Sequence, residues 1–207
     1  MKMLTLHHLR IGRSIFTVWL LEELGLDYQI IEYLRNPETM RAPPALKDVH
    51  ALGKSPVIED DGLLLSESGA IVSYLLEKYD TEGRFSPPRT DLKAWAEYTQ
   101  WLHYPEGSVF SPLLMKMLSL RSGQPQPIFD GFSGPEITLH FDHIADKLAD
   151  NAFILGDTIS GADFGITYMI SMGERLGLLE NHPTLAAYLM RKKARPAFVS
   201  ALARALE

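Results

Sequence analysis

Two short segments of this chain combine residue types that could bind a small ligand. In the first, the sequence Ser-Glu-Ser-Gly-Ala-Ile at 66–71 lies between a predicted hairpin and a predicted helix. A free helix N-terminus can hold a ligand carboxylate, and Glu67 could pair with an ammonium group beside it. An amino-acid head group carries both charges. The more common explanation of such a segment is structural, with Ser66 capping the helix and Glu67 in its first turn.

The second segment is Gly-Lys-Ser-Pro-Val at 53–57, a proline directly before a predicted strand. A proline cannot donate a hydrogen bond to a sheet, so Pro56 belongs at a strand start or a turn. A cis bond between Ser55 and Pro56 would present the backbone of Val57 to a bound peptide. An ordinary trans bond is expected instead, because only about 5% of such bonds in folded proteins are cis.

The 207 residues include no cysteine. The chain therefore has no disulfide, no thiolate metal site and no thiol nucleophile of its own. If the protein performs thiol chemistry, the thiol must arrive with a ligand. No spacing of histidines and carboxylates predicts a metal site, so none is expected.

The composition is that of a globular protein, with 46% hydrophobic and 22% charged residues. The formal net charge of −6 argues against a broad electrostatic surface for nucleic acid or an anionic membrane. A local basic site for an acidic ligand is compatible with it. No apolar run has the ~20 residues of a membrane span and no long apolar signal is visible, so we expect a cytoplasmic protein.

The first 80 residues alternate short apolar runs with helical patterns. The apolar runs predict strands, the last two joined by an Asp-Gly turn, at 3–7, 28–33, 57–59 and 63–65. Apolar spacing predicts a helix over 15–24 that ends at Gly25 in a left-handed cap. Further helices are predicted after Pro43 and Pro44, over 45–50, and at 66–79. The first strand, helix and second strand predict a parallel pair, so the expected order is β-α-β-α-β-β-α around a small mixed sheet.

The rest of the chain is predicted to be helical. A polar, proline-containing linker occupies 81–90, and a helix begins near Asp91. Pro105 and Gly107 are expected to kink or break that helix, and a loop rich in proline and glycine is expected over 122–135. Three or four more helices follow, with Pro183 and Pro196 at the start of the last two.

Taken together, these motifs resemble a known family. Pro56 before a strand, the hairpin, and Glu67-Ser68 at the start of a helix resemble the thioredoxin-like half of a glutathione S-transferase. The helical remainder resembles that family's second domain, so the resemblance covers essentially the whole chain. The segments 19–28, 41–44 and 50–56 look like the bacterial and fungal subfamily that includes a yeast glutathione transferase. The resemblance implies a thioredoxin-like domain over 1–80, a linker over 81–90 and an all-helical domain over 91–207.

A further motif of the resemblance lies in the helical part. Ser-Gly-Ala-Asp at 160–163 is similar to the family's buried capping box, in which the first and last residues exchange hydrogen bonds at a helix start. Its expected role is structural and not catalytic.

The resemblance also implies where glutathione, as co-substrate, would lie. Glu67 and Ser68 would hold its γ-glutamyl head, and the backbone of Val57, presented after Pro56, would pair with the cysteinyl unit as a short added strand. Lys54 would meet the glycyl carboxylate, although a lysine considered alone is more often simply solvated. The absence of cysteine fits this implication, because glutathione carries the thiol.

Catalysis in this family requires a donor that stabilises the thiolate, because a free thiol has a pKa near ~8.5. The related subfamily has Ser-Arg-Ser-x-Arg before the tryptophan, whereas this chain has Gly12 in place of the first serine and Phe16 in place of the second arginine. Ile11, which aligns with the serine of some plant and theta-type enzymes, also lacks a hydroxyl. Ser14, Arg13 and the backbone amides at the helix start are the remaining candidates. Helix capping and a plain surface cation are equally good explanations of those two residues.

A hydrophobic second substrate would need an apolar wall in the helical part. The candidate residues are Trp101, Tyr104, Phe110 and Leu114. Aromatic residues at helical spacing are more often core than pocket. Tyr104 is the polar one, and it could donate a hydrogen bond to a sulfur or to an electrophile.

The function expected from the resemblance is conjugation of the glutathione thiol to a hydrophobic electrophile. A related variant would use the same thiol to reduce peroxides or mixed disulfides. A homodimer is implied by the family. Two alternatives stay open: a non-catalytic binding or regulatory protein on the same fold, favoured by the altered segment 11–16, and another enzyme class on that fold, such as a dehalogenase or isomerase.

Overall fold

The computed structural model describes residues 3–206, and their contacts form two compact units. The sheet unit comprises residues 3–82 together with 193–206, and the helical unit comprises Gly83–Lys192. The fold class predicted from the sequence, a thioredoxin-like part followed by helices, is confirmed. The domain boundaries at 80 and 90 stay predictions, and the last helix packs with the sheet unit.

The sheet has four strands in the order β2-β1-β3-β4. They are β1 (Leu4–Leu9), β2 (Tyr28–Tyr33), β3 (Val57–Asp60) and β4 (Leu63–Ser66). β1 and β2 are parallel, as the sequence predicts, and the other two pairings are antiparallel. Asp61 and Gly62 join β3 to β4 with φ of 47° and 85°, the two positive values that a tight two-residue hairpin turn needs.

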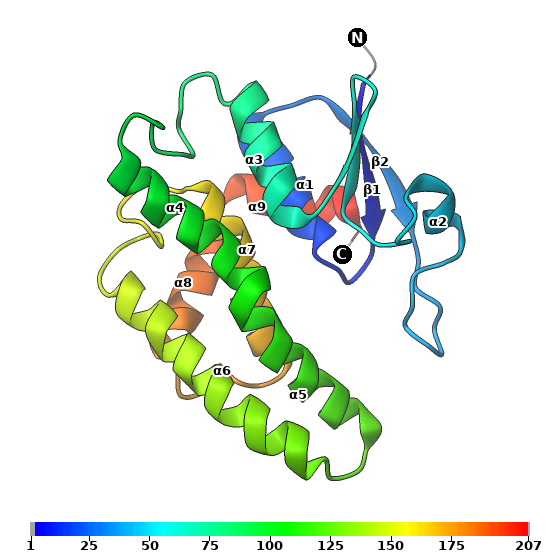
Figure 1. Cartoon of the computed structure of the whole chain (residues 1–207), viewed down its shortest axis with the longest axis vertical. Coiled ribbons are helices and arrows are strands. Elements are labelled where there is room, and N and C mark those ends of the chain that lie inside the picture. Colours follow the sequence, from blue (N-terminus) through cyan, green and yellow to red (C-terminus); the bar gives the residue numbers. More distant parts are fainter. Residues whose placement is uncertain (1–2, 207) are drawn as a thin grey trace. The chain divides into compact units, whose positions relative to one another are not determined.

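Helices cover both faces of this sheet. α1 (Ser14–Leu24) and α3 (Ser68–Tyr79) lie on one face and the short α2 (Ala45–Val49) lies on the other (Figure 1). α1 ends at Gly25, whose φ of 65° gives the predicted left-handed cap. The last helix, α9 (Pro196–Ala205), packs along α1.

Residues 14–21 of α1 are all buried, because β1, α3 and α9 pack around this part of the helix. Trp19 is fully buried, and its ring meets the edge of Phe198 with centroids 5.2 Å apart. Polar contacts surround this apolar contact: Arg195 donates two hydrogen bonds to Glu23, at 2.6 and 2.8 Å, and Ser200 and Arg204 both donate to Glu22. Both apolar and polar contacts therefore hold α9 in the sheet unit.

The helical unit contains six helical segments. They are α4 (Leu92–Tyr104), the π-helical turn η1 (Pro105–Val109), α5 (Phe110–Ser122), α6 (Pro127–Leu148), α7 (Gly161–Arg175) and α8 (Pro183–Lys193). Asp91 caps α4 by accepting a hydrogen bond from Ala94 N at 3.1 Å. The predicted entry of the last two helices at Pro183 and Pro196 is confirmed.

The α-helix ends directly before Pro105, as expected, but the chain does not leave helical geometry there. The chain continues through one wider π-helical turn, in which Phe110 N donates to Pro105 O across five residues. A wider turn accommodates a proline that an α-helix interior excludes. The buried Pro105 also packs on Gly165, where an added Cβ would lie 2.9 Å from the proline Cγ.

The expected loop over 122–135 is wrong, because α6 begins at Pro127 and only 123–126 connect it to α5. Proline suits a first helical turn. The Asp130 side chain accepts hydrogen bonds from Ser119 Oγ at 2.8 Å and from Gln126 N at 3.3 Å, which ties the start of α6 to α5. The packing of α6 along α5 therefore outweighs the helix-breaking tendency of its glycines and of Pro135.

The predicted capping box at the start of α7 is confirmed. Asp163, which is fully buried, accepts hydrogen bonds from Ser160 N at 2.8 Å and Ser160 Oγ at 2.9 Å. It also accepts from Tyr188 Oη at 2.7 Å, so the box anchors α8 as well. Over residues 3–206, none of the helices is long and apolar enough to cross a membrane.

Candidate functional site

The segments that sequence analysis singled out lie together at one end of the sheet. β1 and β2 end there, the antiparallel β3 begins there, and β4 ends there. Leu9 N, at the end of β1, is within hydrogen-bond distance of both Ser14 Oγ and Ser55 Oγ, at 3.2 and 3.1 Å. Val57 pairs with Ser66. The loops at 10–13, 53–56 and 66–68 therefore lie at one end of the sheet unit.

Glu67 forms the turn between β4 and α3. Its φ and ψ are 74° and 117°, a region that non-glycine residues rarely occupy and that costs roughly 1–3 kcal/mol. Its side chain is exposed, and its carbonyl accepts the first helical hydrogen bond, from Ile71 N at 2.9 Å. Such a turn, maintained against its own strain, holds the carboxylate beside the start of α3.

The capping explanation of this segment is wrong. Ser66 is the last residue of β4, where it pairs with Val57, and its hydroxyl lies 3.4 Å from His50 Nε2. Because the strand continues through Ser66, Glu67 takes the position before the helix, and α3 begins at Ser68. No side chain within residues 3–206 caps α3. The N–H groups of its first turn, with the half-buried Ser68, are thus available to an anion.

The segment before β3 differs from expectation at its proline. The Ser55–Pro56 bond is cis, so the expected trans bond is wrong. Val57 is fully buried and lies between β1 and β4, pairing with His7 on one side and Ser66 on the other. An added strand therefore has no open edge at Val57. Pro56, directly before β3, has no backbone N–H, so Ser55 is the nearest preceding residue that could both donate and accept a backbone hydrogen bond.

Lys54 is exposed and follows Gly53 at this end of the sheet. Gly53 has a φ of 57°, and an added Cβ would lie 2.8 Å from Lys47 Cγ. Glycine is required at this position both for the backbone conformation and for the close approach of Lys47.

Ser14 is buried and bonded to the backbone at the start of α1. Its Oγ accepts from Leu9 N at 3.2 Å and lies 3.3 Å from Leu9 O, to which it donates. The residue at the N-cap position is Arg13, half-buried, so Ser14 does not cap the helix. Its hydroxyl proton points at the end of β1.

Gly12 occupies space in which a larger residue does not fit. An added Cβ would lie 2.8 Å from Leu9 O and 3.2 Å from Arg35 Nη2. Ile11 beside it has a φ of 56°, and its side chain is 57% exposed. The loop therefore leaves no room for a side chain at Gly12, the position that aligns with the first serine of the related subfamily. The other departure, Phe16, packs into the apolar contact of Trp19 and Phe198.

Sequence analysis missed Arg35, which follows β2. Its guanidinium donates to the carbonyls of Arg10, Ile11 and Met40, at 3.1, 3.0 and 2.9 Å. An arginine after a half-exposed strand is typical of a solvated surface residue, so the sequence offers no signal for this role.

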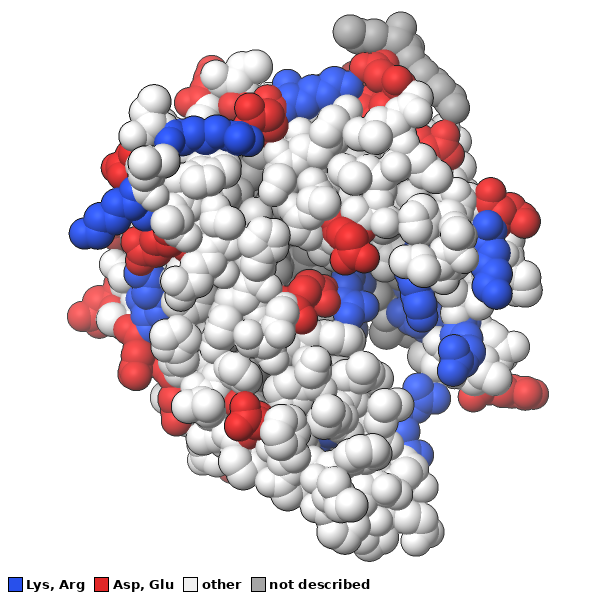
Figure 2. All heavy atoms as spheres, viewed as in Figure 1, with Lys and Arg blue, Asp and Glu red and all other residues white. Residues whose placement is uncertain are grey.

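The charge around this end of the sheet suits an anionic ligand. Figure 2 shows Lys and Arg side chains beside α2 and the loop that follows β2. A separate hollow of about 310 Å³, lined by Asp48, Val49, Glu59, Gly62, Leu63 and Leu64, has two carboxylates that would repel such a ligand. In the described part of the chain, no group of three or more His, Asp or Glu residues is arranged to hold a metal ion.

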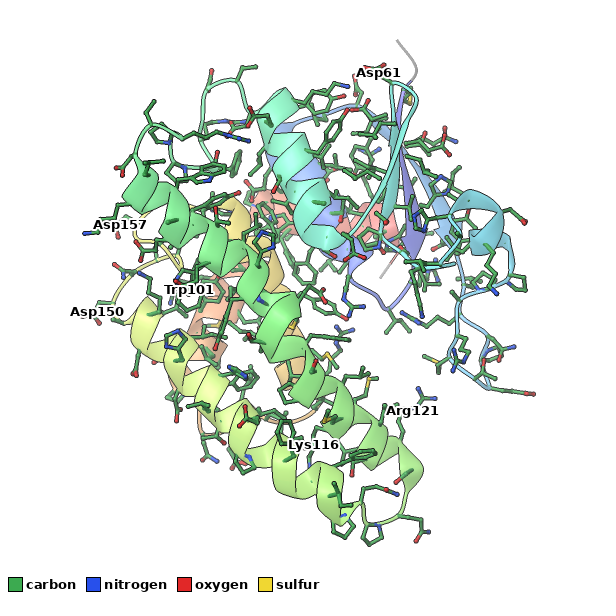
Figure 3. All side chains as sticks on the ribbon, viewed as in Figure 1. Asp61, Trp101, Lys116, Arg121, Asp150 and Asp157 are labelled. Carbon is green, nitrogen blue, oxygen red and sulfur yellow. The ribbon has the colours of Figure 1, made fainter. Side chains whose placement is uncertain are left out.

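The candidate residues for a hydrophobic substrate lie in the helical unit. Trp101 is 3% exposed and lies between α4 and α6, stacked on His143 at a centroid distance of 5.2 Å (Figure 3). Tyr104 meets the edge of Trp101, and its hydroxyl is 2.6 Å from His140 Nδ1. Burial raises the pKa of Tyr104, so its hydroxyl stays protonated at neutral pH.

The other two candidates, Phe110 and Leu114, are half-buried on α5. Trp101 therefore belongs to the core of the helical unit, whereas Tyr104, Phe110 and Leu114 retain exposed surface. His140, which sequence analysis did not single out, holds the Tyr104 hydroxyl in place.

Comparison with known proteins gives consistent matches. A model of the glutathione S-transferase N-terminal domain matches residues 2–77. Glutathione S-transferase 3 of Schizosaccharomyces pombe is 33% identical over 186 residues, which cover 84% of this chain and 75% of that protein. A glutathione S-transferase structure from Actinobacillus pleuropneumoniae is 35% identical with a TM-score of 0.89, covering 98% of this chain and 93% of that one.

A more distant structure shares the fold. It is a glutathione transferase homologue from Lodderomyces elongisporus, solved with two GSH per subunit, at 20% identity and a TM-score of 0.85. The match covers 98% of this chain and 99% of that one. The similarity therefore spans both units of the chain.

Proposed function

Because this chain belongs to the glutathione S-transferase family, we propose that it binds reduced glutathione on its sheet unit and joins the sulfur of the bound tripeptide to a hydrophobic electrophile. The observation that carries the proposal is Glu67. Its exposed carboxylate stands in a strained turn directly before the uncapped first turn of α3. A carboxylate acceptor beside free helical N–H groups complements an α-amino acid, which brings one ammonium and one carboxylate.

The γ-glutamyl head would be held through both of its charged groups. Its ammonium would donate to Glu67, and its carboxylate would accept from the amides at the start of α3 and from the Ser68 hydroxyl. Simple carboxylic acids and simple amines would each satisfy half of the arrangement. The site is therefore expected to select an amino acid over either.

The rest of the tripeptide would extend toward β3. The cysteinyl backbone would pair next to Pro56, and we place this pairing at Ser55, because Val57 lies between two strands. Lys54 is exposed at the same end of the sheet, where it would meet the glycyl carboxylate. Extended pairing at Ser55 would direct the thiol toward the start of α1.

The thiolate would be stabilised by Arg13 and by the backbone N–H groups at the start of α1. A helix N-terminus and a guanidinium each lower the pKa of a nearby thiol. The Ser14 hydroxyl already donates to Leu9 O, so we assign it to positioning α1. In the reaction the thiol loses its proton to solvent, its sulfur forms a bond to an electrophilic carbon, and the leaving group departs with the bonding electrons.

The electrophile would lie against apolar surface of the helical unit. Phe110 and Leu114 offer such surface. The Tyr104 hydroxyl would donate its proton to a polar group on the substrate while accepting a hydrogen bond from His140 Nδ1–H. Trp101 would support this wall from the core.

The test of this proposal is a rate assay with reduced glutathione and an aryl halide, beside a hydroperoxide and a mixed disulfide. Conjugation faster than the uncatalysed rate, saturable in glutathione, supports the transferase. Turnover of only the peroxide or disulfide would assign the same bound thiol to reduction. Glutathione binding without any turnover would favour the non-catalytic alternative, which the hydroxyl-free loop at 11–12 supports.

Family members are dimers, and we extend this state to the present chain as part of the proposal. Light scattering on the purified protein would give about twice the mass of 23.3 kDa for a homodimer. A monomeric mass would contradict that part of the proposal and leave the binding site unaffected.

A further inference from the structure

Arg35 joins two loops that are far apart in the sequence. Its Nε and Nη2 donate to the carbonyls of Arg10 and Ile11 in the loop that leads into α1. Its Nη1 donates to Met40 O, in the loop that follows β2. One planar guanidinium thus satisfies three backbone carbonyls, which a lysine ammonium cannot do in the same geometry.

The second of these loops is closed by its own hydrogen bonds. Asn36 N donates to Arg41 O at 2.9 Å, and Met40 N donates to Asn36 O at 2.8 Å. The Asn36 side-chain oxygen also accepts from the backbone N–H groups of Glu38 and Thr39. The loop at 36–41 is therefore a firm support for the arginine.

The first loop, at 10–12, has an unfavourable backbone conformation that other contacts must stabilise. Ile11 has a φ of 56°, which is unfavourable for a β-branched residue. Gly12 lies so close to Leu9 O and Arg35 that a Cβ does not fit. The hydrogen bond from Arg35 to Ile11 O lies at the strained residue itself.

We propose that Arg35 is a positioning residue of the thiolate site. It holds the loop at 10–12 in the conformation that presents Arg13 and the first amides of α1 to the sulfur of glutathione. In this chain the arginine acts through the loop, in place of a side-chain hydroxyl that the loop lacks. The inference rests on the proposed function and adds to it a residue that does not touch the substrate.

The test uses Arg35→Lys, which keeps the charge, with Arg41→Gln as the matched control. Arg41 is exposed on the same loop, so its substitution removes a cation from the neighbourhood without removing the bonds of Arg35. Four quantities are measured: glutathione affinity by calorimetry, the thiol pKa of bound glutathione from thiolate absorbance, kcat as a function of pH, and amide hydrogen exchange over residues 10–14.

We expect Arg35→Lys to bind glutathione nearly as well as the unaltered protein, because the γ-glutamyl and glycyl contacts are intact. Its bound thiol pKa should rise by about one unit, with kcat near neutral pH falling about tenfold and recovering at higher pH. Exchange at 10–14 should be faster. Arg41→Gln should match the unaltered protein in all four quantities.

An Arg35→Lys protein that is folded and has an unchanged thiol pKa and unchanged exchange would overturn the inference. Faster exchange with an unchanged thiol pKa would also overturn it, because the loop would then not govern the thiolate. Failure of the unaltered protein to bind glutathione would instead overturn the proposed function, and with it the role assigned to Arg35. If Arg35→Lys does not fold, Arg35→Gln and Asn36→Ala, which loosens the supporting loop, serve the same comparison.

Discussion

Ser14 and Leu9 are joined by hydrogen bonds in both directions. The serine Oγ accepts from Leu9 N at 3.2 Å and donates to Leu9 O at 3.3 Å. The serine is fully buried. This relationship fastens the first residue of α1 to the last residue of β1, and it occupies the only hydroxyl in the segment 11–16.

We predict that Ser14→Ala lowers stability more than it lowers chemistry. The free energy of unfolding should fall by about 1–3 kcal/mol, because both hydrogen bonds between the buried serine and Leu9 are lost, although Leu9 N keeps Ser55 Oγ as a partner. The bound thiol pKa should stay unchanged. Denaturant unfolding and a pH–rate profile measure the two effects, with Ser73→Ala on the exposed face of α3 as the control. A normal stability with a large loss of turnover would make Ser14 the thiolate donor.

We predict that Gly12→Ser, which restores the serine of the related subfamily, does not increase turnover. The new Cβ would lie 2.8 Å from Leu9 O, so the backbone must move. The expected loss of stability is about 1–3 kcal/mol, as for other overpacked sites. Gly131→Ser, at an exposed helical glycine with open space around it, should be neutral or stabilising. A faster and equally stable Gly12→Ser protein would show that the loop adapts.

We predict that the contact between α1 and α9 is needed for the stability of the sheet unit. Phe198 is 4% exposed and packs on Trp19 and Phe16. Phe198→Ala should lower the free energy of unfolding by about 3–5 kcal/mol. Val199→Ala, one residue later and 55% exposed, should have little effect. Equal effects of the two substitutions, measured by denaturant unfolding, would contradict the packing described.

We predict that the sheet unit loses stability as pH falls below about 5. Burial alone would raise the pKa of Glu22, but hydrogen bonds from Ser200 and Tyr28 and the charge of Arg204 hold it below its ordinary value. Burial alone would also raise the pKa of Asp60. Hydrogen bonds from Lys78, Tyr79 and Tyr74 outweigh it and hold the pKa of that carboxyl below its ordinary value.

The sign follows from proton uptake. A carboxyl with a lowered folded pKa binds fewer protons when folded than when unfolded, so its contribution is complete above the unfolded pKa of roughly 4 and is lost as pH falls through the folded pKa. Glu22→Gln should therefore be less stable than the unaltered protein at pH 7, with the difference shrinking in acid. Asp27→Asn, at an exposed carboxylate of the same unit, is the control for the loss of one negative charge. A stability difference between Glu22→Gln and the unaltered protein that stays constant with pH would contradict this prediction.

The elements whose cause is local were predictable from the sequence. The Asp61-Gly62 turn, the Gly25 cap and the Ser160–Asp163 box each depend on residues adjacent in the chain. The π-helical turn that follows α4 at Pro105 and the helix that continues through Pro135 could not be predicted, because both depend on tertiary packing. A neighbouring glycine receives Pro105, and α5 supports the helix that contains Pro135.

In the candidate site, too, features with a local cause were predictable and features that depend on packing were not. The position of Glu67 followed from its motif, whereas its strained backbone arises because β4 continues through Ser66. Arg35 gave no signal, since its three acceptors are backbone carbonyls that any sequence possesses. The closed space at Gly12 is likewise a property of how two loops meet.

A calorimetric titration with reduced glutathione at neutral pH, on the unaltered protein, Glu67→Gln and Glu38→Gln, shows whether the Glu67 carboxylate holds the tripeptide. The exposed Glu38 controls for the loss of one negative charge from the sheet unit. We expect glutathione to bind the unaltered protein and Glu38→Gln with millimolar or tighter affinity. Binding to Glu67→Gln should be weaker by about tenfold or more, as expected for a lost charge-assisted hydrogen bond. Equal affinity in all three proteins, or no binding by the unaltered one, would contradict the proposed glutathione site.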